Sequence, residues 1–165
     1  MKNVRYVLPL LLVAVFAMGL SVGVVVAAQP ARPVATPVAT GTLATPAHAV
    51  IVASGEMGTV AGMADVSEVR LVKFELAPGG AFPWHQHPGP VWVVVTQGTL
   101  TFYSAACHPH PYPAGSAFFD PGNLTHTARN EGEEPVEVIA TFMFPADVGA
   151  PSVPHQAPGS CPIEA

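Results

Sequence analysis

The chain has 165 residues, of which 50% are hydrophobic and 10% charged, and its formal net charge is −5. This length predicts a single folded domain. From residue 49 onward, three basic residues stand against eleven acidic ones. That balance argues against a nucleic acid or an anionic membrane surface as a partner, since both require a basic footprint.

Residues 1–28 have the pattern of an export segment. Lys2 and Arg5 precede an uncharged apolar run at residues 7–28. This run is longer than the apolar region of most signal peptides and long enough to span a bilayer, whereas the small residues at 26–28 suit signal peptidase. Two alternatives stay open, a cleaved signal peptide and an N-terminal membrane anchor, and both predict an extracytoplasmic domain, either secreted or anchored to the outer face of the membrane.

Residues 29–48 are rich in Ala, Pro, Thr and Val, and the triplet Ala-Thr-Pro occurs at 35–37 and again at 44–46. A segment of this composition cannot build a core and favours extended conformers, so we expect a semi-rigid linker that reaches up to about 60 Å. The predicted domain then comprises residues 49–165, including a Pro-rich C-terminal tail.

The remainder of the chain indicates an all-β fold. Short runs rich in Val, Phe, Tyr and Thr, separated by Gly and Pro, predict strands at residues 49–53, 69–76, 91–96, 99–104, 116–119, 126–130 and 136–144. Gln97-Gly98 predicts a tight hairpin, and residues 77–80 and 120–123 predict turns with Pro second and Gly third. Several strands are apolar on both faces, which predicts either sheet-on-sheet packing or a homodimer.

Three histidines are candidate metal ligands. His85 and His87 are separated by one residue, so in an extended segment both side chains leave the same face and can reach one ion. His126, about forty residues later, can supply a third imidazole.

The residues around these histidines resemble the two-motif signature of the cupin superfamily, G-x5-H-x-H-x(3,4)-E-x6-G followed by G-x5-P-x-G-x2-H-x3-N. Eight positions of the signature are filled, by Gly79, His85, His87, Gly98, Gly115, Pro121, His126 and Asn130. Two positions differ, because the glutamate of the first motif falls on Val91 and the glycine of the second on Asn123. The resemblance covers residues 69–144 and implies a small double-stranded β-helix, a jelly-roll barrel with its pocket inside.

The resemblance implies that His85, His87 and His126 hold one divalent transition metal. Fe, Mn, Zn, Cu and Ni all stay open, because imidazole ligands alone do not identify the ion. With valine at position 91, an ion held by neutral imidazoles keeps its full charge and an open position for water, oxygen or an anionic substrate.

Several side chains are candidates for roles beside the metal. Asp120, Tyr103 and Glu75 are the candidates that we consider as substitutes for the missing glutamate. Trp84, Val91 and Tyr103 are candidates for bordering a small-molecule substrate, with core packing as the alternative role of the aromatic side chains.

Three functions are compatible with these residues. The first is a metal-dependent oxidoreductase of the dioxygenase type that acts on a small polar or thiol-bearing substrate; its catalytic residues are unknown. The second is a non-catalytic module that binds metal or a small ligand, which the missing carboxylate and the lack of an obvious acid–base pair favour. The third is a structural barrel that dimerises.

Cys107 and Cys161 are the chain's two cysteines, and in an oxidising compartment such a pair predicts one disulfide. This bond would fix the C-terminal tail to the loop that contains Cys107. His108 and His110 in the same loop share a face; they form either a second metal-recruiting element or part of a stiff hairpin tip.

Overall fold

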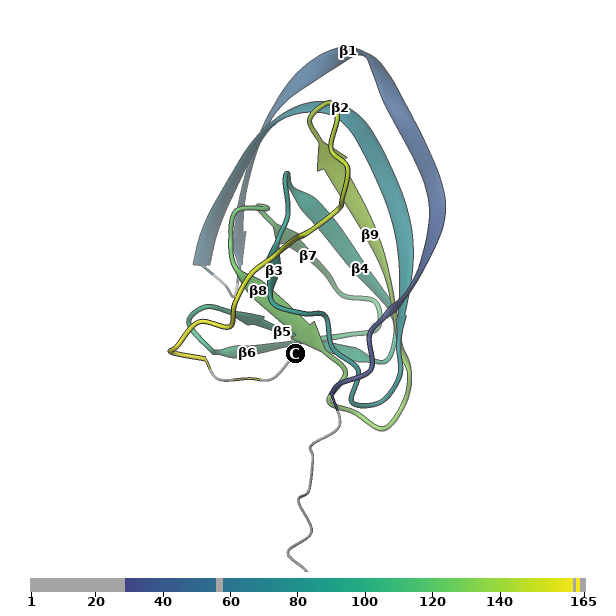
Figure 1. The fold of residues 1–165 in the computed structure, drawn as a ribbon, viewed down its shortest axis with the longest axis vertical. Helices are drawn as coiled ribbons and strands as arrows, with labels where there is room; N and C mark the ends of the chain where they lie inside the picture. Colours follow the sequence, from purple (N-terminus) through teal and green to yellow (C-terminus); the bar gives the residue numbers. More distant parts are fainter. Residues whose placement is uncertain (1–28, 56–57, 162, 164–165) are drawn as a thin grey trace, which may run out of the picture.

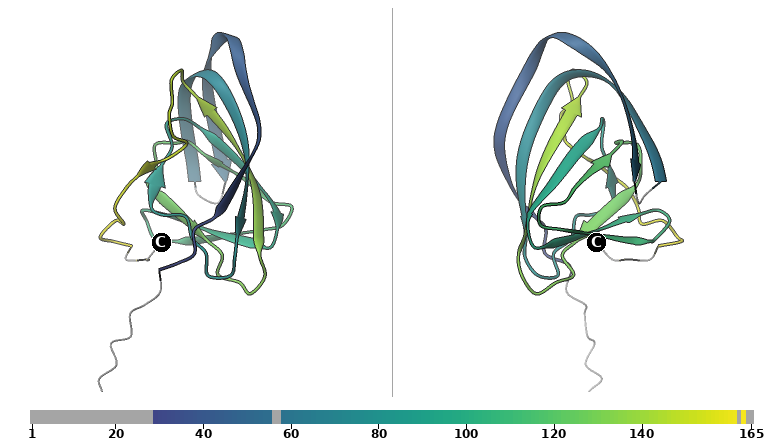
Figure 2. Two further views of the ribbon diagram at one scale, coloured as in Figure 1. Left: turned by 45° about the vertical axis from the view of Figure 1, so that its right-hand side comes forward. Right: turned by 180° about the vertical axis from the view of Figure 1, so that it is seen from behind.

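A computed structural model describes residues 29–55, 58–161 and 163, which contain no helix and fold into two five-stranded antiparallel sheets. The first sheet has the order β1 (Val34–Gly55), β2 (Gly58–Leu76), β9 (Val136–Phe144), β4 (Val91–Gln97) and β7 (Ala117–Asp120). The second has the order β10 (Val153–Pro154), β3 (His85–Gln86), β8 (His126–Arg129), β5 (Thr99–Ser104) and β6 (Pro109–Pro113). The predicted jelly-roll barrel is confirmed (Figures 1 and 2).

The inner faces of the two sheets form the core. Strand β9 alternates strictly between buried and half-buried residues, and Val136, Val138, Ala140, Phe142 and Phe144 are the buried ones. The alternation follows from the two-residue period of a strand, which sends successive side chains to opposite faces. The same face of the first sheet therefore supplies both the packed core and one wall of the interior.

Glycine permits two turns that shape the barrel. Gly98 lies between β4 and β5 with a φ of 71°, and Gly122 follows β7 with a φ of 95°. Both φ values lie in the left-handed region that glycine enters at no steric cost. A Cβ at Gly122 would also lie 2.5 Å from the carbonyl oxygen of Gly89. The turn predicted at residues 120–123 is present. The hairpin predicted at Gln97-Gly98 is wrong, because β4 and β5 belong to different sheets and do not pair with each other; Gly98 instead carries the chain from the first sheet to the second.

The prediction of a free linker at residues 29–48 is wrong from Val34 onward. That segment belongs to β1, which pairs antiparallel with β2 along its whole length and lies outside β2 at the edge of the first sheet (Figure 1). An edge strand needs a partner on one side only, so it tolerates proline where the missing N–H would face away from that partner. The strands predicted at 49–53 and 69–76 are the last parts of β1 and β2.

The C-terminal tail packs on the second sheet. Its short strand β10 pairs with β3, and the backbone N–H of His155 donates to the carbonyl oxygen of Trp84. Across residues 29–55, 58–161 and 163, no helix is long and apolar enough to cross a membrane. The export segment predicted at residues 1–28 lies outside the described residues.

Candidate metal centre

The three predicted ligands lie together inside the barrel. His85 on β3 is the direct cross-strand partner of His126 on β8, and His87 follows β3 by one residue. One ring nitrogen from each histidine lies within 4.8 Å of the others. Adjacent strands of the second sheet thus unite residues that are about forty positions apart in the sequence.

Backbone carbonyl groups fix the orientation of all three imidazole rings. The Nδ1 atoms of His85, His87 and His126 lie 2.6, 2.7 and 2.8 Å from the carbonyl oxygens of Pro83, Pro151 and Leu124. A carbonyl oxygen only accepts, so each Nδ1 carries the proton and donates it. In the neutral tautomer each Nε2 therefore presents an unprotonated lone pair.

Burial keeps these rings neutral. His85 and His126 are buried and His87 is nearly so, and removal from water lowers the pKa of each from 6.5 to about 4. The Nε2 atoms of His85 and His87 are 3.2 Å apart. With both rings neutral, neither atom has a hydrogen to share, so two lone pairs face each other.

Phenylalanine rings hold the histidines in place. The His126 ring stacks on Phe102 at 5.0 Å, and the His87 ring meets Phe142 edge-on at 5.3 Å. Rings held by both packing and a hydrogen bond lose little further conformational freedom on binding an ion.

Asp120, at the end of β7, extends from the first sheet into the same space. Its Oδ2 atom lies 3.2 Å from Nε2 of His126 and 3.7 Å from Nε2 of His87. Its Oδ1 atom accepts a hydrogen bond from the backbone N–H of Gly122 at 2.7 Å, whereas Oδ2 is buried without a hydrogen-bond partner. Burial raises the pKa of this carboxyl group, and nearby His87 and the Gly122 N–H oppose that rise.

The spacing of these atoms fits a shared transition-metal ion. Two ligand atoms that each lie about 2.1 Å from one ion are about 3.0 Å apart at a right angle and about 3.4 Å apart at a tetrahedral angle. The separations of 3.2 Å between His85 and His87 and of 3.2 Å between His126 and Asp120 lie in that interval. Converging lone pairs and a buried, unpartnered carboxylate oxygen are what a cation would satisfy.

Comparison with known proteins agrees with this arrangement. The family model described as "Cupin domain" matches residues 72–142. Residues 72–142 are a cupin domain. The match includes His85, His87 and His126, the whole of strands β3 to β8, and parts of β2 and β9.

Curated plant proteins are similar to part of this chain. Germin-like protein 5-1 of Oryza sativa subsp. japonica is 37% identical over 79 residues, which are 45% of this chain and 36% of that protein. Germin-like protein subfamily 2 member 1 of Arabidopsis thaliana is 34% identical over 97 residues, 56% of this chain and 44% of that protein. Auxin-binding protein ABP19b of Prunus persica is 32% identical over 83 residues, 47% and 40% of the two chains. The matched region thus spans less than half of each relative.

A cupin superfamily protein of Desulfitobacterium hafniense aligns with a TM-score of 0.48 at 11% identity, over 73% of this chain and 84% of that one.

The cavity of the cupin domain has a volume of about 120 Å³. Its polar lining consists of the three histidines, Asp120 and Ser152, and the rest is Phe, Val, Leu, Ala and Pro. Val91, predicted to border a substrate, does line it. The cavity is somewhat smaller than an apolar cavity of about 150 Å³ that binds benzene, so it suits a molecule of a few heavy atoms.

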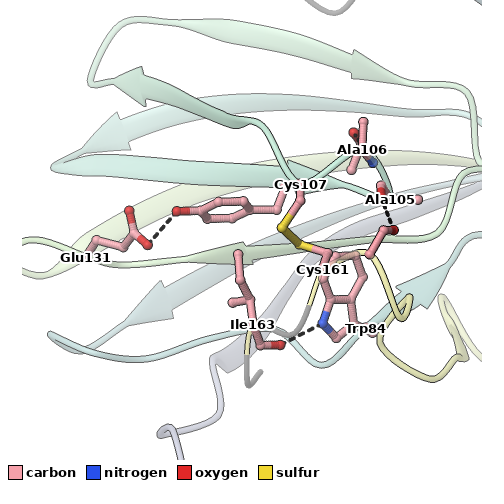
Figure 3. Close-up of a disulfide and its surroundings, with 10 residues drawn as sticks. Trp84, Ala105, Ala106, Cys107, Glu131, Cys161 and Ile163 are labelled. Carbon is pink, nitrogen blue, oxygen red and sulfur yellow. Dashed lines mark hydrogen bonds between the residues drawn. A yellow bond between two sulfur atoms is a disulfide. The ribbon is translucent and has the colours of Figure 1, made fainter.

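Trp84 and Tyr103, the other two predicted pocket residues, are not among the residues that line the cavity. They pack instead with Cys161 on the outer side of the second sheet. Each is adjacent in sequence to a residue that faces the cavity, His85 or Phe102, and strand alternation sends neighbours to opposite faces. Trp84 donates its indole N–H to the Ile163 carbonyl oxygen (Figure 3). Tyr103 donates its hydroxyl to Glu131.

The predicted disulfide between Cys107 and Cys161 is present and joins the β5–β6 turn to the C-terminal tail (Figure 3). His108 immediately precedes β6 and His110 lies within it, on the far side of β5 from β8. Among the described residues, the only cluster of three or more potential metal ligands is His85, His87 and His126. The histidine pair at 108 and 110 is thus part of a hairpin.

Proposed function

We propose that this chain is an extracytoplasmic cupin protein that binds a divalent transition metal through His85, His87 and His126. The observation that carries the proposal is the convergence of three imidazole nitrogens whose tautomers are fixed by backbone carbonyl groups, two of them 3.2 Å apart. Burial lowers the pKa of each ring to about 4, so near neutral pH all three stay in the form that binds metal.

We further propose that the protein is an oxidoreductase of the dioxygenase type. A bound iron or manganese ion would supply a site at which oxygen and a small substrate meet. The apolar walls formed by phenylalanine and aliphatic side chains would exclude water and orient the apolar part of the substrate. The anionic or other metal-binding group of the substrate would then point toward the histidines.

A non-catalytic ligand-binding module is the second candidate. It is supported by the cavity lining, in which Asp120 and the three histidines are the only ionisable groups among the residues that the structure describes. If those side chains are occupied by a metal, no separate acid or base remains to move a proton. The similarity to an auxin-binding protein also supports small-ligand binding.

The extracytoplasmic location is supported by two features. The Cys107–Cys161 disulfide is typical of proteins in an oxidising compartment. Residues 1–28 have the composition of an export segment. Whether that segment is cleaved or retained as an anchor would be decided by the mass of the mature protein.

Elemental analysis tests the metal proposal. The full-length chain would be exported and purified without chelator or histidine tag, beside a His85→Ala, His87→Ala variant and a His110→Ala control. We expect about one equivalent of a transition metal in the wild type and the control, and none in the double variant. Oxygen uptake with small thiols and phenols would then separate the two functions, because only the dioxygenase consumes oxygen. Wild-type protein that holds no metal after reconstitution would refute the proposal.

A further inference from the structure

The unusual atom of this site is Oδ2 of Asp120. A buried carboxylate oxygen normally has a hydrogen-bond donor, because leaving it without one costs several kcal/mol, on the order of an ion's desolvation. Here Oδ1 has the Gly122 N–H, whereas Oδ2 has no donor in the described part of the chain. The side chain is 3% exposed, so bulk water does not replace the missing donor.

The nearest polar neighbours of this oxygen do not donate to it. Nε2 of His126 is 3.2 Å away, but the proton of that ring is on Nδ1, which donates to the Leu124 carbonyl oxygen. Nε2 of His87, at 3.7 Å, likewise carries no proton, because Nδ1 of that ring donates to the Pro151 carbonyl oxygen. With Asp120 ionised, three atoms that can only accept therefore lie close together, namely its Oδ2 and the Nε2 atoms of His87 and His126, and a cation between them would satisfy all three.

The strand register explains why an aspartate occupies this place. Val91 on β4 stands where the cupin signature has its glutamate, and Val91 and Asp120 are direct cross-strand partners. Side chains of directly opposite residues share one face and have Cβ atoms about 5 Å apart. The carboxylate at position 120 thus reaches, from the adjacent strand, the same interior space that a carboxylate at position 91 would reach.

The other candidates for this role lie elsewhere. Tyr103 donates to Glu131 near the disulfide, on the face of β5 opposite to the cavity. Glu75 pairs with Lys73 and is half exposed. Asp120 alone among the three lines the cavity.

We propose that Asp120 is a fourth metal ligand, which replaces from β7 the carboxylate missing at position 91, and that it biases the site toward Mn²⁺ and Fe²⁺ over Zn²⁺ and Cu²⁺. The inference rests on the proposed metal binding at the three histidines. An anionic oxygen ligand reduces the net charge of the site and favours harder ions relative to a site made of imidazole alone. Because Gly122 anchors Oδ1, the aspartate is held with Oδ2 toward the imidazoles.

Metal affinity in matched variants tests this inference. Metal-free full-length protein would be titrated with Mn²⁺ and, separately, with Zn²⁺, for the wild type, Asp120→Asn and Glu131→Gln. The control removes the same charge from a residue that contacts Tyr103 rather than the histidines. We expect Asp120→Asn to weaken Mn²⁺ binding by at least about 10-fold and Zn²⁺ binding by less, and Glu131→Gln to change neither.

A transfer variant tests the geometry. Moving the carboxylate back to β4 in a Val91→Glu, Asp120→Ala protein should recover part of the Mn²⁺ affinity that Asp120→Ala alone loses. A folded transfer variant that binds no better than Asp120→Ala would count against the shared position.

A wild-type measurement avoids any dependence on how the variants fold. The chain contains three aspartates, at positions 65, 120 and 147, so ¹³C-labelled aspartate gives three side-chain carboxyl signals that can be followed as Zn²⁺ is added. We expect one signal to shift with the stoichiometry of binding, and it should be absent from Asp120→Asn. If wild-type protein binds metal with no shifted aspartate signal, or if Asp120→Asn binds Mn²⁺ as tightly as the wild type, this inference fails alone. If the wild type binds no metal, the proposed function fails with it.

Discussion

At the scale of single residues, the three buried histidines make the stability of the metal-free protein depend on pH. Their pKa values are lowered to about 4, against 6.5 in an unfolded chain. Between these values the unfolded chain binds protons that the native protein does not, so the free energy of unfolding falls as pH falls from about 6.5 to about 4. The pKa of Asp120 is raised, so at pH values above its ordinary pKa of 3.8 this group makes the free energy of unfolding increase as the pH falls. It opposes the three histidines but is a single group.

Urea unfolding of the metal-free protein at pH 7, 6 and 5 measures this dependence. A His87→Gln variant should show a shallower loss of stability on acidification, because one of the three groups is gone. His110→Gln, in β6 and outside the cavity, is the control and should follow the wild type. Equal stability of wild-type protein at pH 7 and pH 5 would contradict the neutral, buried state of the rings.

The histidines were predictable from the sequence because their spacing alone places them on one face and in a recognisable motif. The role of Asp120 was not. The sequence offers Asp120, Tyr103 and Glu75 as equivalent candidates, and the choice depends on which residue of β7 stands opposite Val91. The register between two strands about thirty residues apart is set by tertiary packing, so it cannot be predicted from the sequence of either strand.

At the scale of elements, the Cys107–Cys161 disulfide holds the C-terminal tail against the second sheet. The two cysteines are 54 residues apart. Closing a loop of that length in the unfolded chain corresponds to about 4 kcal/mol of stabilisation in the chain-entropy model. We expect a Cys107→Ser, Cys161→Ser variant to lose a free energy of unfolding of that order, measured by urea denaturation without reductant.

The tail also contributes to the site, because the Pro151 carbonyl oxygen fixes the His87 ring and β10 pairs with β3. The disulfide-free variant should therefore bind Mn²⁺ more weakly than the wild type, although no ligand has been changed. Wild-type protein treated with reductant provides the matched comparison. Unchanged stability in the variant would show that the tail is held by β10 and its other contacts alone.

Strand β1 shows where composition misleads. A segment rich in Ala, Thr and Pro has the composition of a linker, and nothing in it requires a partner. In the protein it pairs with β2 at the edge of the sheet, where backbone hydrogen bonds rather than buried side chains hold it. Four of its valines remain exposed, at positions 34, 38, 50 and 52. Alternation of apolar and polar residues predicts a strand only where one face is buried, so the sequence of β1 does not show this pattern.

At the scale of the whole molecule, the site joins the two sheets. His85 and His126 come from β3 and β8 of the second sheet, whereas Asp120 comes from β7 of the first. An ion bound by all of them would cross-link the sheets through the interior. Metal binding should then stabilise the barrel as a unit rather than only the segments near the histidines.

The stabilisation can be calculated from mass action. At a free Mn²⁺ concentration of 100 times Kd, a ligand that binds only the native state adds about 2.7 kcal/mol to the free energy of unfolding. For a domain of this size, that corresponds to a rise in Tm of roughly 8 °C. Calorimetry with and without Mn²⁺ should show this rise in the wild type, its reversal by EDTA, and no rise in His87→Ala. An equal rise in His87→Ala would mean that the ion binds and stabilises the protein at another place, and the converging imidazoles would then have only a structural role.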